Sequence, residues 1–241
     1  MGEIGGATRL VALLGNPVAG SLSPRMQNAA FAARGLDWAY VACEVDDVEA
    51  AVRGLVALGF AGANVTIPHK EAAAGLCNEA DGDAVNTLVF RDARVLGFNT
   101  DREIVAGIEA ERVCLIGAGG SARALLPALP GEVRQFTRSG DWPPDASGAD
   151  LVVNCTPVRD ELLVEPRPEQ AVVDLAYRAD GSPTALVAAA RAAGCRVVVD
   201  GLEALVRQGA ASFERWTGVP APTAVMRAAV GAGADRSTGS S

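Results

Sequence analysis

The sequence alternates short apolar runs with alanine-rich stretches of helical periodicity along most of its length. Such alternation is typical of α/β proteins, in which helices cover the faces of a largely parallel sheet. One series fills the first hundred residues, and a second begins at Arg112. The predicted strands span residues 10–14, 40–45, 63–67, 87–90, 113–116, 133–136, 151–154, 172–175 and 196–199. The predicted helices span residues 25–34, 47–58, 69–76, 121–129, 184–193 and 202–216. We therefore expect two α/β domains with a ligand site between them.

The composition favours small-molecule chemistry. A net charge of −8, with acids and bases interspersed over 241 residues, argues against nucleic acid, whose recognition needs a basic face. No apolar run approaches the roughly 18 residues of a membrane span, so no membrane partner is expected. Five cysteines without a Cys-x-x-Cys pair are typical of reduced thiols in a cytoplasmic protein, and no metal site is expected. The small polar residues from Ala232 onward predict a frayed tail.

Polar side chains gather where the predicted strand 63–67 ends. Asn64 and Thr66 are two residues apart, so they share one side of a strand. Pro68 suits the start of a helix, which places Lys70 in the first turn. An amide, a hydroxyl and an ammonium suit a polyhydroxylated anion or a carbonyl that is being reduced. The alternative is a plain strand and turn with a solvated lysine, and His69 is expected to be an exposed residue of the helix start.

A glycine-rich turn predicts a nucleotide site. Residues 113–116 form an apolar strand, and Gly117, Gly119 and Ala122 then match the spacing G-x-G-x-x-A at a helix start. In such turns the glycines let the backbone approach a pyrophosphate, and the helix N-terminus supplies N–H donors. The next strand, 133–136, is followed by Thr137, Arg138 and Ser139 instead of an acid. An arginine there favours a 2′-phosphate and hence NADP over NAD, although an ordinary surface arginine is the alternative.

These segments resemble the shikimate dehydrogenases and their quinate- and aminoshikimate-using relatives. The similar motifs are Ser-Leu-Ser-Pro at 21–24, Asn-Val-Thr-Ile-Pro-His-Lys at 64–70, Ala-Val-Asn-Thr at 84–87, Gly-Phe-Asn-Thr-Asp at 97–101, Asn-Cys-Thr-Pro at 154–157, Tyr177, and the run from Asp200-Gly201-Leu202 to Gln208. They follow the order of the family and cover most of the chain. The resemblance implies reversible, NADP-dependent reduction of 3-dehydroshikimate to shikimate, within aromatic amino acid and chorismate biosynthesis.

The resemblance also implies a role for each matching residue. Lys70 and Asp101 would be the catalytic pair. The substrate-binding residues would be Ser21, Ser23, Asn64, Thr66, Asn86, Tyr177 and Gln208. The cofactor-binding residues would be Gly117, Ala118, Gly119, Gly120, Ser121, Ala122, Thr137, Arg138, Ser139, Thr156 and Gly201. Without the resemblance, Asp101 could equally be the N-cap of a helix over residues 102–110.

The chain departs from the family mainly in its cofactor region. A second basic residue expected after Arg138 is missing, and only 11 residues separate Ser139 from Leu151. A crossover that contains a helix needs a dozen residues or more, so we expect that a helix and a strand have been lost. Weak cofactor affinity or tolerance of NAD would follow. Gly20, Ile104 and Ala204 also replace residues that are usual in the family, and each replacement could loosen cofactor positioning.

The fold class expected is α/β, with an N-terminal substrate-binding domain (1–100 plus 212–235) and a Rossmann-like NADP-binding domain (101–211) with a trimmed sheet edge. A C-terminal helix is expected to return to the first domain. The expected function is NADP-dependent shikimate dehydrogenase, with shikimate or 3-dehydroshikimate as the small-molecule partner. The expected oligomeric state is a monomer or homodimer. The alternatives are a quinate or aminoshikimate dehydrogenase, or a shikimate-binding paralogue with little catalytic activity.

Overall fold

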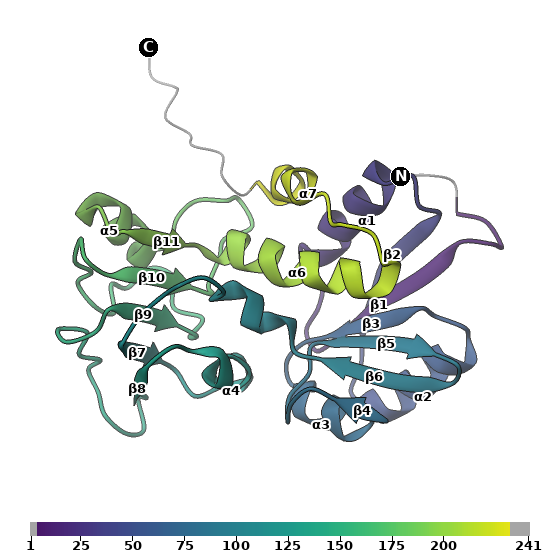
Figure 1. The fold of residues 1–241 in the computed structure, drawn as a ribbon, viewed down its shortest axis with the longest axis horizontal. Coiled ribbons are helices and arrows are strands. Elements are labelled where there is room, and N and C mark those ends of the chain that lie inside the picture. The colour runs from purple at the N-terminus through teal and green to yellow at the C-terminus, as the bar shows by residue number, and fades with distance from the viewer. Residues whose placement is uncertain (1–3, 232–241) are drawn as a thin grey trace, which may run out of the picture.

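A computed structural model describes residues 4–231, and within them two α/β units lie side by side (Figure 1). The predicted tail beyond Ala232 falls outside the described residues. The first unit is built on a six-stranded sheet of order β2-β1-β3-β5-β6-β4. Its strands are β1 (Arg9–Gly15), β2 (Trp38–Glu44), β3 (Gly62–Val65), β4 (Glu79–Ala80), β5 (Thr87–Arg91) and β6 (Arg94–Phe98). β1, β2 and β3 run parallel, whereas β5 pairs antiparallel with β3 and β6.

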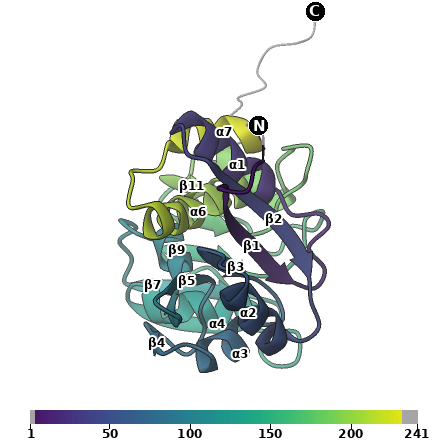
Figure 2. The same cartoon turned by 90° about the vertical axis from the view of Figure 1, so that its right-hand side faces the viewer.

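Both faces of this sheet are covered, because its central strands carry apolar residues on both sides. The helices α2 (Val48–Ala57) and α3 (Lys70–Gly75) cover one face. On the other face lie α1 (Ser23–Ala33), α6 (Gly201–Thr217) and α7 (Thr223–Val230). Figure 2 shows α1 and α7 on one side of the parallel strands and α2 with α3 on the other. The predicted C-terminal helix is therefore present, and it packs on α1 through Met226 and Val230.

The second unit is a parallel five-stranded sheet of order β11-β10-β9-β7-β8. Its strands are β7 (Arg112–Ile116), β8 (Glu132–Phe136), β9 (Leu151–Asn154), β10 (Ala171–Asp174) and β11 (Val197–Val199). One face packs against the 3₁₀ helix η1 (Thr100–Ile104) and α4 (Gly120–Leu125), which continues into the 3₁₀ helix η2 (Leu126–Ala128). The opposite face packs against α5 (Ala185–Ala193). This is a Rossmann-like arrangement with the glycine-rich turn at the end of β7, the strand that lies between β9 and the edge strand β8.

The trimmed edge predicted for the second sheet is confirmed. In the described chain, residues 137–150 connect β8 to β9 without a helix or strand, so β8 is left as the edge strand. The connection still covers the sheet, because Ala146 and Ala149 are buried in the same cluster as Phe136. The Gln170 side chain holds it there by donating to the backbone oxygens of Ala146 (2.8 Å) and Ala149 (2.9 Å).

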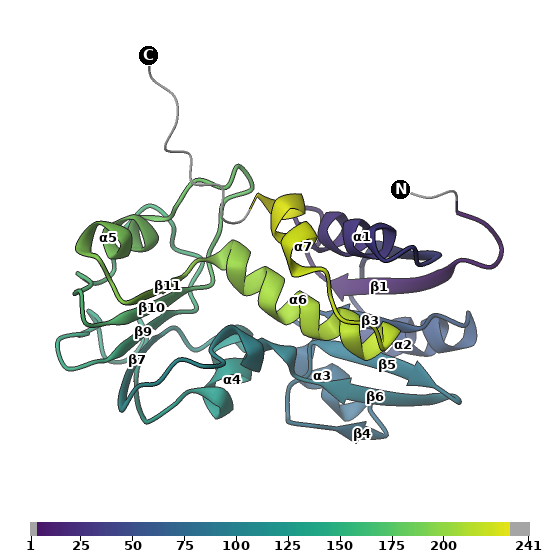
Figure 3. The same ribbon diagram turned by 45° about the horizontal axis from the view of Figure 1, so that its top comes forward.

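The helix α6 joins the two units. It begins where Asp200 accepts a hydrogen bond from the backbone N–H of Glu203, and it ends at Gly218, whose φ of 69° suits glycine. Figure 3 shows α6 running from the end of β11 to the first sheet. Its buried face contains Val206, Phe213 and Trp216, so the first unit is completed by the C-terminal part of the chain.

The predicted strands and helices are present, with ends shifted by a few residues, but β4, β6 and η1 were not predicted. The hairpin between β5 and β6 turns at Asp92 and Ala93, which have φ of 50° and 59°. Neither residue is glycine, so the usual hairpin signal is missing. The domain boundaries expected from the sequence stay a prediction, and residues 232–235 lie outside the described part. Among residues 4–231, no helix is long and apolar enough to cross a membrane.

Candidate active site

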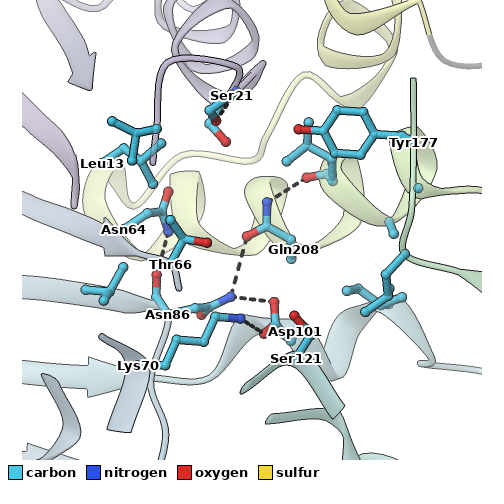
Figure 4. Close-up of a pocket in the computed structure, with 18 of the residues that line it drawn as sticks. Leu13, Ser21, Asn64, Thr66, Lys70, Asn86, Asp101, Ser121, Tyr177 and Gln208 are labelled. Atoms are coloured by element: carbon cyan, nitrogen blue, oxygen red, sulfur yellow. Dashed lines mark hydrogen bonds and ion pairs between the residues drawn. The ribbon is translucent and has the colours of Figure 1, made fainter. Parts of the chain in front are cut away.

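The strand β3 and the start of α3 bring polar side chains to the space between the two units (Figure 4). Asn64 lies in β3 and Thr66 directly after it, and Lys70 is the first residue of α3. Lys70 is buried, with 9% of its surface exposed, so the alternative of a solvated lysine is wrong. His69 is also buried, and its Nε2 donates to the backbone oxygen of Val45 (2.8 Å), so the expectation of an exposed histidine is wrong.

Lys70 forms a buried ion pair with Asp101. The distance from Nζ to Oδ2 is 2.5 Å, and each side chain is only 10% exposed. Asp101 lies in η1, whose N-cap is Asn99, because the Asn99 side chain accepts from the backbone N–H of Asp101 (3.1 Å). Asp101 is therefore not the cap of a following helix. Its second oxygen, Oδ1, accepts from Nδ2 of Asn86 (2.7 Å), so both carboxylate oxygens are held by side chains of the first unit.

The orientation of the Asn86 amide follows from its neighbours. Its Oδ1 accepts from the backbone N–H of Thr100 (2.8 Å) and from the hydroxyls of Thr100 (3.0 Å) and Thr87 (3.1 Å). Because a backbone N–H only donates, the oxygen must face Thr100 and the nitrogen must face Asp101. Asn86 thus holds the carboxylate in one position beside Lys70.

Asn64 is held by a buried polar cluster that sequence reasoning missed. Its Oδ1 accepts from the Tyr40 hydroxyl (2.8 Å), and its Nδ2 donates to Thr87 Oγ1 (3.1 Å), Ser212 Oγ (3.1 Å) and the Asn86 backbone oxygen (2.9 Å). Burial raises the pKa of Tyr40 well above its usual value, so its hydroxyl stays a donor. The one sequence signal for Ser212 is its spacing of four residues from Gln208, which places both on one face of α6.

Lys70 carries a further sequence signal. It is the only lysine in the chain, so the other 20 of the 21 basic residues are arginines. An ammonium releases its proton far more readily than a guanidinium does, and its pKa responds to its surroundings. An ammonium at this one buried position is suited to proton transfer.

A cavity of about 370 Å³ lies beside this pair and is lined from both units. It brings together many of the residues expected at the site: Ser21, Ser23, Asn64, Thr66, Lys70, Asn86, Asp101, Ser121, Tyr177, Gly201 and Gln208. Figure 4 shows Ser21 and Tyr177 at the opposite end from Lys70 and Asp101, with Gln208 between them. The three departures noted in the sequence, Gly20, Ile104 and Ala204, also line it. The cavity therefore presents hydroxyls at one end and the ion pair at the other.

The serine loop precedes α1. The backbone N–H of Ser23 donates to Ser21 Oγ (3.2 Å), and Ser23 is the first residue of α1. Gln208, on α6, donates through Nε2 to the backbone oxygen of Leu205 (2.8 Å), and its Oε1 lies 3.5 Å from Nδ2 of Asn86. Burial raises the pKa of Tyr177, so this hydroxyl is neutral at physiological pH. These neutral donors suit a carboxylate or a ring hydroxyl.

The glycine-rich turn fits a dinucleotide. Gly117 has a φ of 109°, a conformation that favours glycine, and a Cβ there would meet Cγ2 of Thr156 at 3.2 Å. Among the described atoms, none lies within 4 Å of a Cβ placed on Gly119 or Gly120, so the backbone of the turn borders open space. Ala118 and Ser121 complete the turn, and Ala122 is fully buried where α4 packs on the sheet. The residues present therefore suit the pyrophosphate expected from the sequence.

The loop after β9 lies between this turn and the ion pair. Thr156 Oγ1 donates to Asn154 Oδ1 (2.7 Å), and Asn154 Nδ2 donates to Oδ1 of Asp174 (2.9 Å). Burial raises the pKa of Asp174, although its hydrogen bonds oppose that shift. Burial, together with the charge of Asp101, raises the pKa of the Cys155 thiol to about 12. Cys155 is therefore an inert thiol near the ion pair.

Of the expected cofactor residues, only Ser121 and Gly201 line the cavity. Thr137, Arg138 and Ser139 lie on the connection after β8. Thr137 Oγ1 and Ser139 Oγ are 3.4 Å apart. The guanidinium carbon of Arg138 lies 5.5 Å from the ring centre of Trp142. Its Nη2 lies 3.8 Å from Oε2 of Glu161, which belongs to the loop after β9.

Comparisons with known proteins agree with this geometry. Residues 13–88 match the sequence model described as shikimate dehydrogenase substrate binding domain, and residues 201–230 match shikimate 5'-dehydrogenase C-terminal domain. The shikimate dehydrogenase (NADP(+)) of Moorella thermoacetica is 40% identical, with 93% of each chain covered. That of Rubrobacter xylanophilus is 41% identical, with 95% of this chain and 97% of the relative covered.

A solved structure is also similar over nearly the whole chain. The shikimate 5-dehydrogenase of Thermus thermophilus, in complex with NADP(H) and shikimate, aligns with a TM-score of 0.81 at 30% identity. The alignment covers 92% of this chain and 98% of that one. Taken with the relatives of about 40% identity, it shows that this chain belongs to the shikimate dehydrogenase family.

Proposed function

We propose that this protein is an NADP-dependent shikimate dehydrogenase, which reversibly reduces 3-dehydroshikimate to shikimate in the shikimate pathway. The observation that carries the proposal is the buried pair of Lys70 and Asp101, 2.5 Å apart, which borders a cavity lined by hydroxyl and amide side chains. The family membership and the relatives named for this activity support it.

The cavity matches the chemistry of shikimate, a ring with one carboxylate and three hydroxyls. Ser21 and Ser23 would hold the carboxylate, because they offer two neutral hydroxyls at the end of the cavity away from Asp101. Asn64, Thr66, Asn86 and Gln208 would bind ring hydroxyls, with Tyr177 on the same side as the serines. With the carboxylate at the serine end, the ring hydroxyls extend toward the Lys70–Asp101 pair.

Lys70 would transfer the proton. In the direction of reduction, its Nζ donates a proton to the alkoxide oxygen that forms at C3. In the reverse direction it receives the proton of the C3 hydroxyl. Asp101 holds the ammonium in place and offsets its charge, while Asn86 fixes the carboxylate. Because the pair is buried, its hydrogen bonds and charges act in a less polar surrounding than water.

The glycine-rich turn would hold the cofactor pyrophosphate, and Arg138 the 2′-phosphate. When bound, NADP supplies the hydride acceptor for the substrate carbinol carbon. Gly201 lines the cavity and Thr156 lies beside Gly117, and both would contact the nicotinamide half. We further infer a monomer or homodimer in the cytoplasm, and the five free cysteines support this location.

The test is the initial rate at which reduced cofactor forms with shikimate, with NADP and NAD in parallel and quinate as the alternative substrate. We expect robust turnover with shikimate and NADP. Faster turnover with quinate would reassign the substrate. If no cofactor were reduced while calorimetry showed that shikimate binds, the protein would instead be a shikimate-binding paralogue. Lys70→Ala serves as the inactive control.

A further inference from the structure

Arg138 and Glu161 face each other across the end of the strand that leads into the glycine-rich turn. Arg138 follows β8 and Glu161 follows β9, and these two strands flank β7 in the sheet. The backbone N–H of Gly117 donates to the oxygen of Phe136 (2.9 Å), and that of Cys155 donates to the oxygen of Ile116 (2.8 Å). The pair therefore spans the place where the adenosine half of a dinucleotide leaves the turn.

Glu161 is the carboxylate that pairs with Arg138 in the described part of the chain. Their closest nitrogen and oxygen atoms are 3.8 Å apart, and the two side chains are 69% and 66% exposed. Two other acids of the trimmed connection, Asp141 and Asp145, pair with Arg134 at 3.7 Å and 3.8 Å.

The Arg138 guanidinium lies over the indole of Trp142. The ring centre lies 5.5 Å from the guanidinium carbon. The backbone N–H of Thr137 donates to the oxygen of Asp141 (3.2 Å), which closes the turn that carries Arg138 and leads directly to Trp142. A guanidinium that lies against an aromatic face keeps its N–H edge free for an anion. That edge is the one that Glu161 approaches.

We propose that Glu161 is a specificity-determining residue, which weakens the preference for NADP over NAD because it competes with the 2′-phosphate for Arg138. The proposal rests on the proposed function, since it assigns the adenosine end of that same cofactor site. A 2′-phosphate carries close to two negative charges, and it must displace the Glu161 carboxylate or bind beside it. NAD has a hydroxyl at this position, so the competition does not affect it.

The test measures binding, so that its result does not depend on turnover. 2′,5′-ADP and 5′-AMP, which differ only in the 2′-phosphate, are titrated calorimetrically into the full chain, as are NADP and NAD. We expect Glu161→Gln to tighten 2′,5′-ADP and NADP about threefold at physiological ionic strength, and up to about tenfold at low salt. The affinities for 5′-AMP and NAD should stay within roughly 1.5-fold, because the removed charge has no phosphate partner there.

A matched control separates the ion pair from a general change in charge. Asp160 is the preceding residue in the same loop, and it pairs with Arg178 instead of Arg138. Asp160→Asn removes the same charge, and it should change the ratio of 2′,5′-ADP to 5′-AMP affinity by much less than Glu161→Gln. In an Arg138→Ala background, Glu161→Gln should tighten the binding of 2′,5′-ADP by less than in the parent protein, because the guanidinium for which Glu161 and the 2′-phosphate compete is gone.

The outcomes separate this proposal from the proposed function. An unchanged affinity ratio in Glu161→Gln, or an equal change in Asp160→Asn, overturns the role of Glu161, even if shikimate is oxidised normally with NADP. The expected change in the ratio supports the role, even if shikimate oxidation is absent and the proposed function fails. Loss of the salt dependence of the Glu161→Gln effect would also overturn it, because the competition is electrostatic.

Discussion

Replacing Lys70 with alanine tests the chemistry and the energetics of the site together. The substitution removes the proton donor, so kcat should fall by about 10² to 10⁴, the range for general acid–base groups. KM for shikimate should change much less than kcat, because the serines and amides of the cavity remain. Initial rates over a range of shikimate concentrations at saturating NADP separate these two quantities.

The same substitution should lower stability. It leaves the Asp101 carboxylate buried, with Asn86 Nδ2 as its remaining side-chain donor. Breaking a buried pair typically costs about 3–5 kcal/mol, and we expect about 3 kcal/mol because the cavity admits water to the freed oxygen. Urea unfolding measures this loss. Arg53→Ala is the matched control, since it removes a cation from a pair with Glu49 that is 68% and 57% exposed, and should cost about 0.5 kcal/mol at most.

A double variant makes the prediction refutable. Adding Asp101→Asn to Lys70→Ala removes the unpaired charge, so stability should recover by more than half while turnover stays low. Turnover of Lys70→Ala within a few-fold of the parent would refute the proton-transfer role. An unchanged unfolding free energy in that variant would refute the buried ion pair.

Three further predictions concern the stability of the fold. Ser212→Ala should lower the unfolding free energy by about 1–2 kcal/mol in urea, because its buried hydroxyl bonds Asn64, Thr87 and the Gln208 backbone; no change would contradict the buried cluster. Glu203→Gln should cost about 1 kcal/mol at pH 7, because Arg227 lowers the pKa of Glu203 below its usual 4.5. That contribution is present above pH 4.5 and is lost as pH falls through the lowered pKa, so parent and variant should converge in acid, and a constant gap would contradict the assignment. Ala93→Gly should raise stability by about 1 kcal/mol, since Ala93 has a φ of 59°; a lower thermal midpoint would contradict it.

The sequence predicted those parts of the fold that depend on local patterns. The alternation of apolar runs predicted both α/β units, and the 11 residues between Ser139 and Leu151 predicted the lost helix and strand. The hairpin into β6 was missed because its turn, Asp92-Ala93, lacks the glycine that usually marks such turns. The position of Lys70 at the start of the helix after β3 was predicted from strand alternation and Pro68. Its burial could not be predicted in this way, because burial depends on packing between the units.

The parts of the site that were missed depend on contacts between distant residues. Ser212 contacts Asn64 across 148 residues, and Tyr40 contacts it from β2, which β1 separates from β3 in the sheet. The buried His69 donates a hydrogen bond to a backbone carbonyl 24 residues earlier, and no local pattern indicates this contact. The pairing of Arg138 with Glu161 likewise depends on the order of the strands in the sheet. Local periodicity contains no information on such pairings.

The most direct test of the central claim is the transfer of deuterium from shikimate labelled at C3. Mass spectrometry of the reduced cofactor, formed from NADP by the purified protein, shows where the hydride originated. We expect the reduced cofactor to be one mass unit heavier than with unlabelled shikimate, and Lys70→Ala to form it far more slowly. Reduced cofactor without deuterium, or none at all while shikimate binds, would contradict the assignment of a C3 dehydrogenase.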